Sequence, residues 1–250
     1  MTDAARLPRR AGIVLILVML GAVLFAGLCA LGIWQIERRA WKLDLIERVD
    51  ARVHAEPVAA PTPAQWPSIN KSDDEYRRIF LQGRYLNDRE TLVQAVTERG
   101  GGFWVVTPFQ AADGFIVLVN RGFVPKERQA PDQRTGGQIE DETRLTGLLR
   151  MSEPDGGFLR ANDPAADRWF SRDVDAIASK RDLRDVAPYF VDADAINNPG
   201  APVGGLTVLR FNNNHLTYAL TWFGLALMVL AALAFLLRDE LRLRKRSGAT

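Results

Sequence analysis

The 250-residue sequence contains one cysteine and only two histidines, His54 and His215. A single cysteine excludes an intramolecular disulfide and a metal site built from several cysteines. Because neither residue type occurs between positions 55 and 214, a Ser-His-Asp or Cys-His catalytic machine is excluded from that region. Acidic residues are plentiful there, which leaves a carboxylate pair for hydrolysis open. The glycines at 100–102 lack the following Lys-Ser/Thr of a phosphate-binding loop.

Charge is absent from two long stretches, residues 12–34 and residues 216–237. A helix of 22 residues is ~33 Å long, enough to cross the ~30 Å hydrocarbon core of a bilayer. The first stretch is longer than the roughly 7–15 apolar residues of a signal peptide. Leu28 precedes Cys29 where a lipoprotein anchor would need a small residue. The sequence therefore predicts two transmembrane helices.

The tails outside these stretches are basic. Residues 1–11 carry a formal charge of +2 and residues 238–250 carry +3, and since the total is +2, the middle carries −3. Basic short tails stay in the cytoplasm and long loops translocate largely regardless of charge. We therefore expect both termini in the cytoplasm and the middle on the other side. The pI near 8.8 then reflects tails beside the lipid bilayer and not a nucleic-acid surface.

The middle region divides into three parts. Residues 37–54 have the spacing of an amphipathic helix that continues out of the membrane, and His54 is expected to be solvated. A Pro-rich linker completes residues 35–67. Residues 68–211 are expected to form a β-rich domain, before a second span, 212–237, with a polar entry. Strands are predicted at 78–85, 91–97, 103–109, 115–124, 144–150, 168–171, 189–192 and 206–211, with a turn at the three glycines.

One short helix is expected at 173–180, with Asp173 as its N-cap. The fold class predicted is an α+β membrane protein, with two transmembrane helices flanking a mainly antiparallel β domain. In the first span, Ala22, Ala26, Ala30 and Trp34 recur at i+4. Small residues at that spacing predict contact with the second span, although chance in an alanine-rich helix explains them equally well.

Ordered motifs along the chain resemble the Surfeit locus protein 1 family, membrane-bound assembly factors of haem-copper cytochrome oxidases. The motifs are Gly32-Ile33-Trp34-Gln35, Tyr76-Arg77-Arg78, Gly83-Arg84-Tyr85, residues 102–109, residues 119–125, residues 147–150, Asn162-Asp163-Pro164, Arg168-Trp169-Phe170, residues 188–194 and Asn213-Asn214-His215. Two positions depart from the family pattern: Phe123 stands in place of the usual tryptophan, and Asn212 in place of an expected proline.

The resemblance implies a non-enzymatic role, in which haem a is received or presented while the oxidase core subunit acquires it. It also implies a location in the bacterial plasma membrane, with the middle domain in the periplasm. Eukaryotic relatives occupy the mitochondrial inner membrane. Enzymes of haem a synthesis are further possible partners. The alternatives are a cofactor-free scaffold for the core subunit and an extracytoplasmic sensor or hydrolase.

His215 is the residue expected to ligate haem iron, since imidazole is a common iron ligand. Tyr218, Ala219 and Trp222 lie at i+3, i+4 and i+7 from it, on one helix face. Ala219 is expected to leave room and Trp222 to offer an apolar wall, with Arg210 near the propionates. Asn212 or a backbone carbonyl is expected to bind the other ring nitrogen. The expected cofactor-binding residues are His215, Tyr218, Trp222, Trp34 and Gln35. The competing interpretation of His215 is a polar residue at a helix end.

Overall fold

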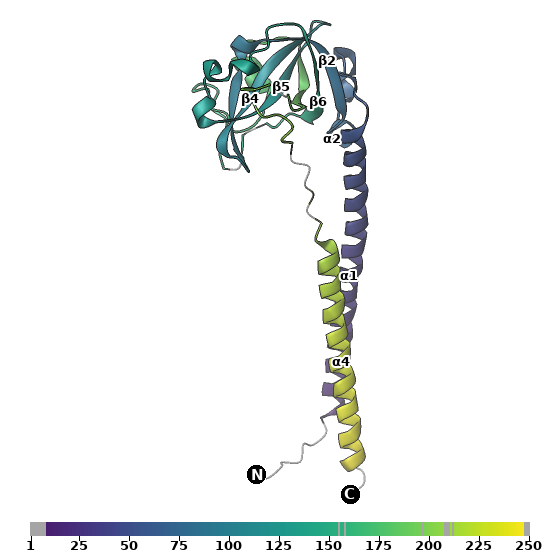
Figure 1. The fold of residues 1–250 in the computed structure, drawn as a ribbon. Helices are drawn as coiled ribbons and strands as arrows, with labels where there is room; N and C mark the ends of the chain where they lie inside the picture. Colours follow the sequence, from purple (N-terminus) through teal and green to yellow (C-terminus); the bar gives the residue numbers. More distant parts are fainter. Residues whose placement is uncertain are drawn as a thin grey trace. The chain divides into compact units, whose positions relative to one another are not determined.

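The computed structural model describes residues 9–154, 156–157, 159–196, 198–207, 211 and 213–247. The chain divides into two compact units, Met1–Glu47 with Arg210–Thr250, and Arg48–Leu209. The first unit is a pair of long helices, and the strands of the described residues all belong to the second (Figure 1). The two units are described separately below.

The helix pair consists of α1, Ala11–His54, and α4, His215–Ser247. Both helices are long and apolar enough to cross a membrane. The expected amphipathic segment is the continuation of α1, whose last part belongs to the second unit. Helix α4 likewise continues beyond the apolar stretch through most of the basic tail. The predicted fold class, with two membrane helices flanking a β domain, is confirmed.

The helices meet along a seam whose buried and half-buried positions alternate four and three residues apart. On α1 these are Val14, Val18, Gly21, Phe25, Leu28, Gly32 and Gln35; on α4 they are His215, Ala219, Trp222, Ala226, Val229, Leu233, Leu236 and Glu240. This spacing is that of a heptad seam. A Cβ atom at Gly32 would lie 2.6 Å from the Phe223 ring, and one at Gly21 would lie 2.5 Å from Leu233. The two glycines therefore allow close approach.

The expected alanine stripe is not the contact face. Ala22, Ala26 and Ala30 are all exposed. With 3.6 residues per turn, a strict i+4 series drifts around the helix by about 40° at each step. Only alternation of four and three residues keeps a stripe on one seam, and this alternation passes through Gly21, Leu28 and Gly32.

The second unit is a closed β-barrel with two added strands. The strands are β1 (Val58–Ala59), β2 (Arg78–Tyr85), β3 (Thr91–Thr97), β4 (Gly100–Ala111), β5 (Ile116–Pro125), β6 (Thr143–Met151) and β7 (Val186–Ala193). Their order is β1-β2-β6-β7-β5-β4-β3, and β2 also pairs with β4, which closes the ring. The β1–β2 and β5–β7 pairs are parallel and the others antiparallel. Side chains such as Ile79, Phe109, Val119, Leu149 and Tyr189 fill the interior.

A second apolar cluster includes Phe190 of β7, whose neighbours Tyr189 and Val191 belong to the barrel core. It also contains the fully buried Trp169 and two residues of α3 (Val174–Lys180), Val174 and Ile177. The Asp173 side chain accepts a hydrogen bond from the Ala176 N–H, which confirms the predicted N-cap. Residues 168–171 are not a strand, because their sheet contacts are isolated bridges such as Val93 to Trp169.

The glycines at 100–102 lie inside β4, so the expected turn is wrong; the chain reverses at Glu98 and Arg99. A Cβ atom at Gly102 would lie 2.2 Å from the Val124 carbonyl oxygen, so glycine is required there by strand packing. Of residues 206–211, Leu206, Thr207 and Phe211 are outside strands, and 208–210 lie outside the described residues.

The Pro-rich segment contributes to the barrel. Its β1 pairs with β2, and the Pro61 carbonyl accepts hydrogen bonds from Tyr189 Oη and Trp66 Nε1. The remaining short helices are η1 (Pro63–Ser68), α2 (Lys71–Asp74), η2 (Asn87–Arg89), η3 (Lys126–Arg128) and η4 (Pro131–Gly137).

Candidate functional site

A hydrogen-bonded pair of polar residues stands at one end of the helix seam. His215 is the first residue of α4, and its Nδ1 lies 2.7 Å from Oε1 of Gln35 on α1. Gln35 is 9% exposed. An amide oxygen can only accept a hydrogen bond, so the ring nitrogen Nδ1 donates it. The bond orients the imidazole and, in a neutral ring, places the lone pair on Nε2, which is the arrangement of a metal-ligating histidine.

The other residues expected around His215 occupy different places. Trp222 is half-buried on the same seam, whereas Trp34 and Tyr218 are 52% and 55% exposed. Ala219 is buried between the helices, so it does not leave space beside the histidine. Within the described residues the partner of the ring is Gln35 and not a backbone carbonyl. Asn212 and Arg210 lie outside the described residues.

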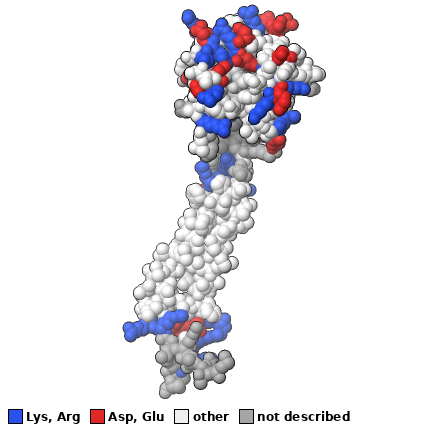
Figure 2. Space-filling view, turned by 90° about the vertical axis from the view of Figure 1, so that its left-hand side faces the viewer, with Lys and Arg blue, Asp and Glu red and all other residues white. Residues whose placement is uncertain are grey.

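A second polar pair closes the opposite end of the same seam. Glu240 is 3% exposed and accepts hydrogen bonds from the Arg9 backbone N–H at 3.0 Å and from Arg9 Nη1 at 3.1 Å. Along α4, His215 and Glu240 are ~37 Å apart at ~1.5 Å per residue, slightly more than the hydrocarbon thickness of a bilayer. On the face seen in Figure 2, the helix pair shows an uncharged band with lysine and arginine gathered at both ends. The two polar pairs therefore mark the ends of the membrane-spanning part.

Gly32 lies about one turn from Gln35 on the seam, so a substitution at Gly32 tests the contact between the two helices. Gly32→Leu should push α4 away from α1, since even a Cβ atom would overlap the Phe223 ring. We expect thiol cross-linking between Gln35→Cys and His215→Cys, in a Cys29→Ser background, to fall severalfold. Gly27→Leu is the matched control, because a Cβ atom there meets nothing within 4 Å. Equal cross-linking in both variants would contradict the seam.

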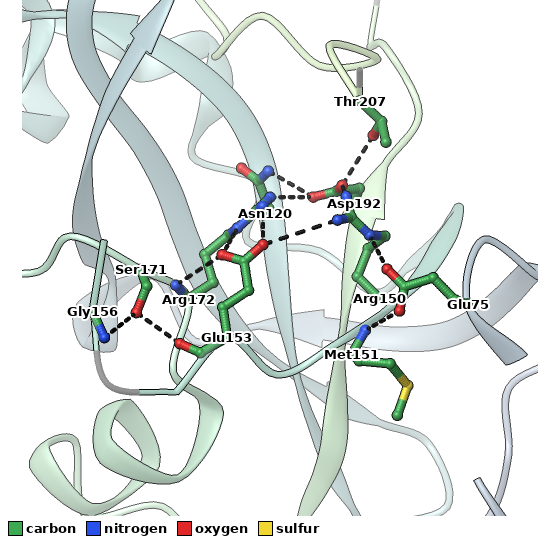
Figure 3. A network of polar contacts seen from close by, with 10 residues as sticks. All are labelled: Glu75, Asn120, Arg150, Met151, Glu153, Gly156, Ser171, Arg172, Asp192 and Thr207. Atoms are coloured by element: carbon green, nitrogen blue, oxygen red, sulfur yellow. Dashed lines mark hydrogen bonds and ion pairs between the residues drawn. The ribbon is translucent and has the colours of Figure 1, made fainter. Parts of the chain in front are cut away.

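The β-barrel carries a buried network of charged residues centred on Asp192 of β7 (Figure 3). Its two carboxylate oxygens accept hydrogen bonds from Arg150 Nη1 at 2.7 Å, Arg172 Nη1 at 3.0 Å, Asn120 Nδ2 at 2.7 Å and Thr207 Oγ1 at 3.0 Å. Asp192 is 5% exposed. One carboxylate thus joins β5, β6, β7, the segment before α3 and the segment that leads to α4.

Two further carboxylates complete the network. Glu75 binds Arg150 Nε at 2.8 Å and the Met151 N–H at 3.0 Å, and Glu153 binds Arg172 through two nitrogens at 3.0 and 2.6 Å. Burial alone would lower the pKa of the Arg150 guanidinium, but Asp192 and Glu75 outweigh burial and raise this pKa above its ordinary value. Arg150 therefore remains charged, and the carboxylates of Asp192, Glu75 and Glu153 contact the two arginines.

This network is not apparent from the sequence, because its members are spread from residue 75 to residue 207. The sequence feature that could have pointed to the network is the set of family motifs, since Arg150 and Asp192 each lie in one of these motifs. The network holds the barrel together with its flanking segments, which gives these motif residues a structural role.

Comparison with known proteins agrees with this architecture. A model of the SURF1 family matches residues 22–227, a range that includes Gln35, Asp192 and His215. Surfeit locus protein 1 of Homo sapiens is 39% identical over 214 residues, covering 78% of this chain and 69% of the human protein. The Gallus gallus protein of the same name is 37% identical over 224 residues, covering 82% and 69%. A SURF1-like protein of Drosophila melanogaster is 33% identical over 226 residues, covering 82% and 71%. With similarity that extends through the barrel and into both helices, the chain belongs to the SURF1 family.

Proposed function

We propose that the protein is an assembly factor for haem-copper cytochrome c oxidase, and that it binds haem a through His215 and assists its insertion or retention in the core subunit. Membership of the SURF1 family supports the role in oxidase assembly. The observation that carries the haem proposal is the His215–Gln35 pair. We infer a binding role without a catalytic centre.

The residues at this end of the seam suit a haem. A neutral imidazole is an established haem ligand, and Gln35 holds the His215 ring with Nε2 free. The Asn213 side-chain oxygen, two residues earlier, is buried without a hydrogen-bond partner in the described part of the chain, so the polar end of α4 is incomplete by itself. A bound haem a would supply an iron centre, an apolar ring and two carboxylates. His215 would hold the iron, and its place at the membrane edge would keep the ring in an apolar environment with the carboxylates near water.

The partners follow from the same arrangement. The core subunit of the oxidase would receive the haem, the enzymes of haem a synthesis would supply it, and the bilayer would surround α1 and α4. We also propose a bacterial plasma membrane location, and the basic tails support an orientation with both termini cytoplasmic and the barrel periplasmic.

The test is the visible absorption spectrum of the full-length protein, purified in neutral detergent from cells that make haem a. We expect haem a absorption, and we expect cells lacking the protein to assemble less active oxidase. A haem-free protein that still restores oxidase would support the cofactor-free scaffold instead. Normal oxidase in cells without the protein would contradict the assembly role.

A further inference from the structure

Two cations extend the α1 side of the seam beyond Gln35. Arg39 and Lys42 follow Gln35 by four and seven residues, so they continue the seam spacing where the pattern would place apolar side chains. Both are half-buried. Neither forms an ion pair with any carboxylate in the described part of the chain. The Lys42 ammonium faces a ring, with Nζ 5.3 Å from the centroid of Phe211.

The surroundings of these cations are positive. Helix α4 begins at His215, so the unpaired N–H groups of its first turn and the positive end of its dipole lie at this end of the seam. The nearest acids along α1, Glu37 and Asp44, are exposed and lie off the seam positions. Half-buried charges of one sign without counter-charges are unfavourable by themselves. The arrangement is suited to an anionic group that is not part of the chain.

The distance from His215 is short. With a rise of ~1.5 Å per residue, Arg39 lies ~6 Å and Lys42 ~10 Å along α1 from Gln35, which contacts the His215 ring. Long, flexible arginine and lysine side chains can cover this interval from either position. Arg38, by contrast, is exposed, and its guanidinium stacks on the Trp41 ring at 4.0 Å.

We propose that Arg39 and Lys42 bind the two propionate carboxylates of the haem whose iron is held by His215. The inference rests on the proposed haem-binding function and assigns the residues that fix the orientation of the haem. Iron ligation by His215 alone allows rotation about the iron–nitrogen bond, whereas two carboxylates held on the α1 side select one direction. Charge-assisted hydrogen bonds from arginine and lysine to carboxylates are also among the stronger polar contacts.

The experiment compares two probes that differ only in the carboxylates, iron protoporphyrin IX and its dimethyl ester. Each is titrated into the purified full-length protein in neutral detergent, and binding is followed by the shift of the haem absorption band. We expect the double variant Arg39→Gln, Lys42→Gln to bind the free acid about tenfold or more weakly. Its affinity for the ester should equal that of the unchanged protein. Arg38→Gln is the matched control and should bind both probes normally.

The outcomes separate the two proposals. If the unchanged protein binds neither probe, the haem-binding function itself is wrong. If it binds both probes, and the double variant either binds the free acid normally or loses affinity for both probes equally, the propionate assignment is wrong while haem binding stands.

Anionic lipid headgroups carry oxygens similar to those of the propionates. A double variant that loses affinity only for vesicles containing phosphatidylglycerol, and not for the free acid, would identify the cations as headgroup contacts and overturn the inference.

Discussion

His215→Ala is expected to insert in the membrane at a near-normal level and to lose the haem spectrum. The side chain contributes one hydrogen bond at the end of a seam that runs through two long helices, so its removal leaves the helix pair and the barrel intact. It does remove the nitrogen that we propose as the iron ligand. Absorption spectra of the purified variant and oxidase activity in the same cells measure the two effects.

Two other substitutions sharpen this test. Gln35→Leu keeps the imidazole but removes its partner, so haem affinity should fall about 10–100-fold without being abolished. His54→Ala, the only other histidine change available, should alter neither measurement, because His54 is exposed and its ring bonds Asp50 within the same helix. Full haem content in His215→Ala would show that His215 is a polar residue at a helix end. Loss of haem with normal oxidase would show that the bound haem is not needed for assembly.

Asp192→Ala should lower the free energy of unfolding of the β-barrel by about 3–5 kcal/mol, because it leaves the buried Arg150 and Arg172 without their shared carboxylate. The side chains of these arginines are each 14% exposed, so water offsets only part of the lost interaction. Urea unfolding of the detergent-solubilised protein, followed by tryptophan fluorescence, measures the change.

Asp194→Ala is the matched control from the same motif. Asp194 pairs with Arg78, but their side chains are 41% and 32% exposed, so the loss should be about 1 kcal/mol or less. Equal unfolding midpoints for the two variants would show that Asp192 is not the centre of the network.

Patterns within short stretches of sequence predicted the helices and strands whose formation depends on neighbouring residues. Absence of charge over 23 and 22 residues identified the two membrane helices, and alternation located most of β2 to β7, with the bounds of β2 and β3 correct. The Asp173 cap was also predictable, because a capping residue acts within its own turn. At His215, sequence reasoning identified the histidine and the motif containing Gln35 but not the bond between them.

What remained hidden depends on contacts between distant segments. The predicted alanine stripe consists of small residues, as a close helix contact requires, but its spacing is wrong. Only the partner helix shows that the small residues in contact are Gly21 and Gly32. The role of Asp192 requires Arg150, Arg172 and Thr207 to meet, and barrel closure between β2 and β4 decides which strands face each other. None of these distances is encoded in a window of neighbouring residues.

The helix seam has a consequence for the order of events during synthesis. Its polar pairs join residues 180 positions apart, Gln35 with His215, and 231 positions apart, Arg9 with Glu240. At ~5–20 residues per second, translation needs on the order of 10–40 s to add the 180 residues that separate the first pair. Helix α1 spends that time in the bilayer with Gln35 unpaired. All of Arg48–Leu209 emerges within the same interval, so the barrel is expected to fold before the seam closes.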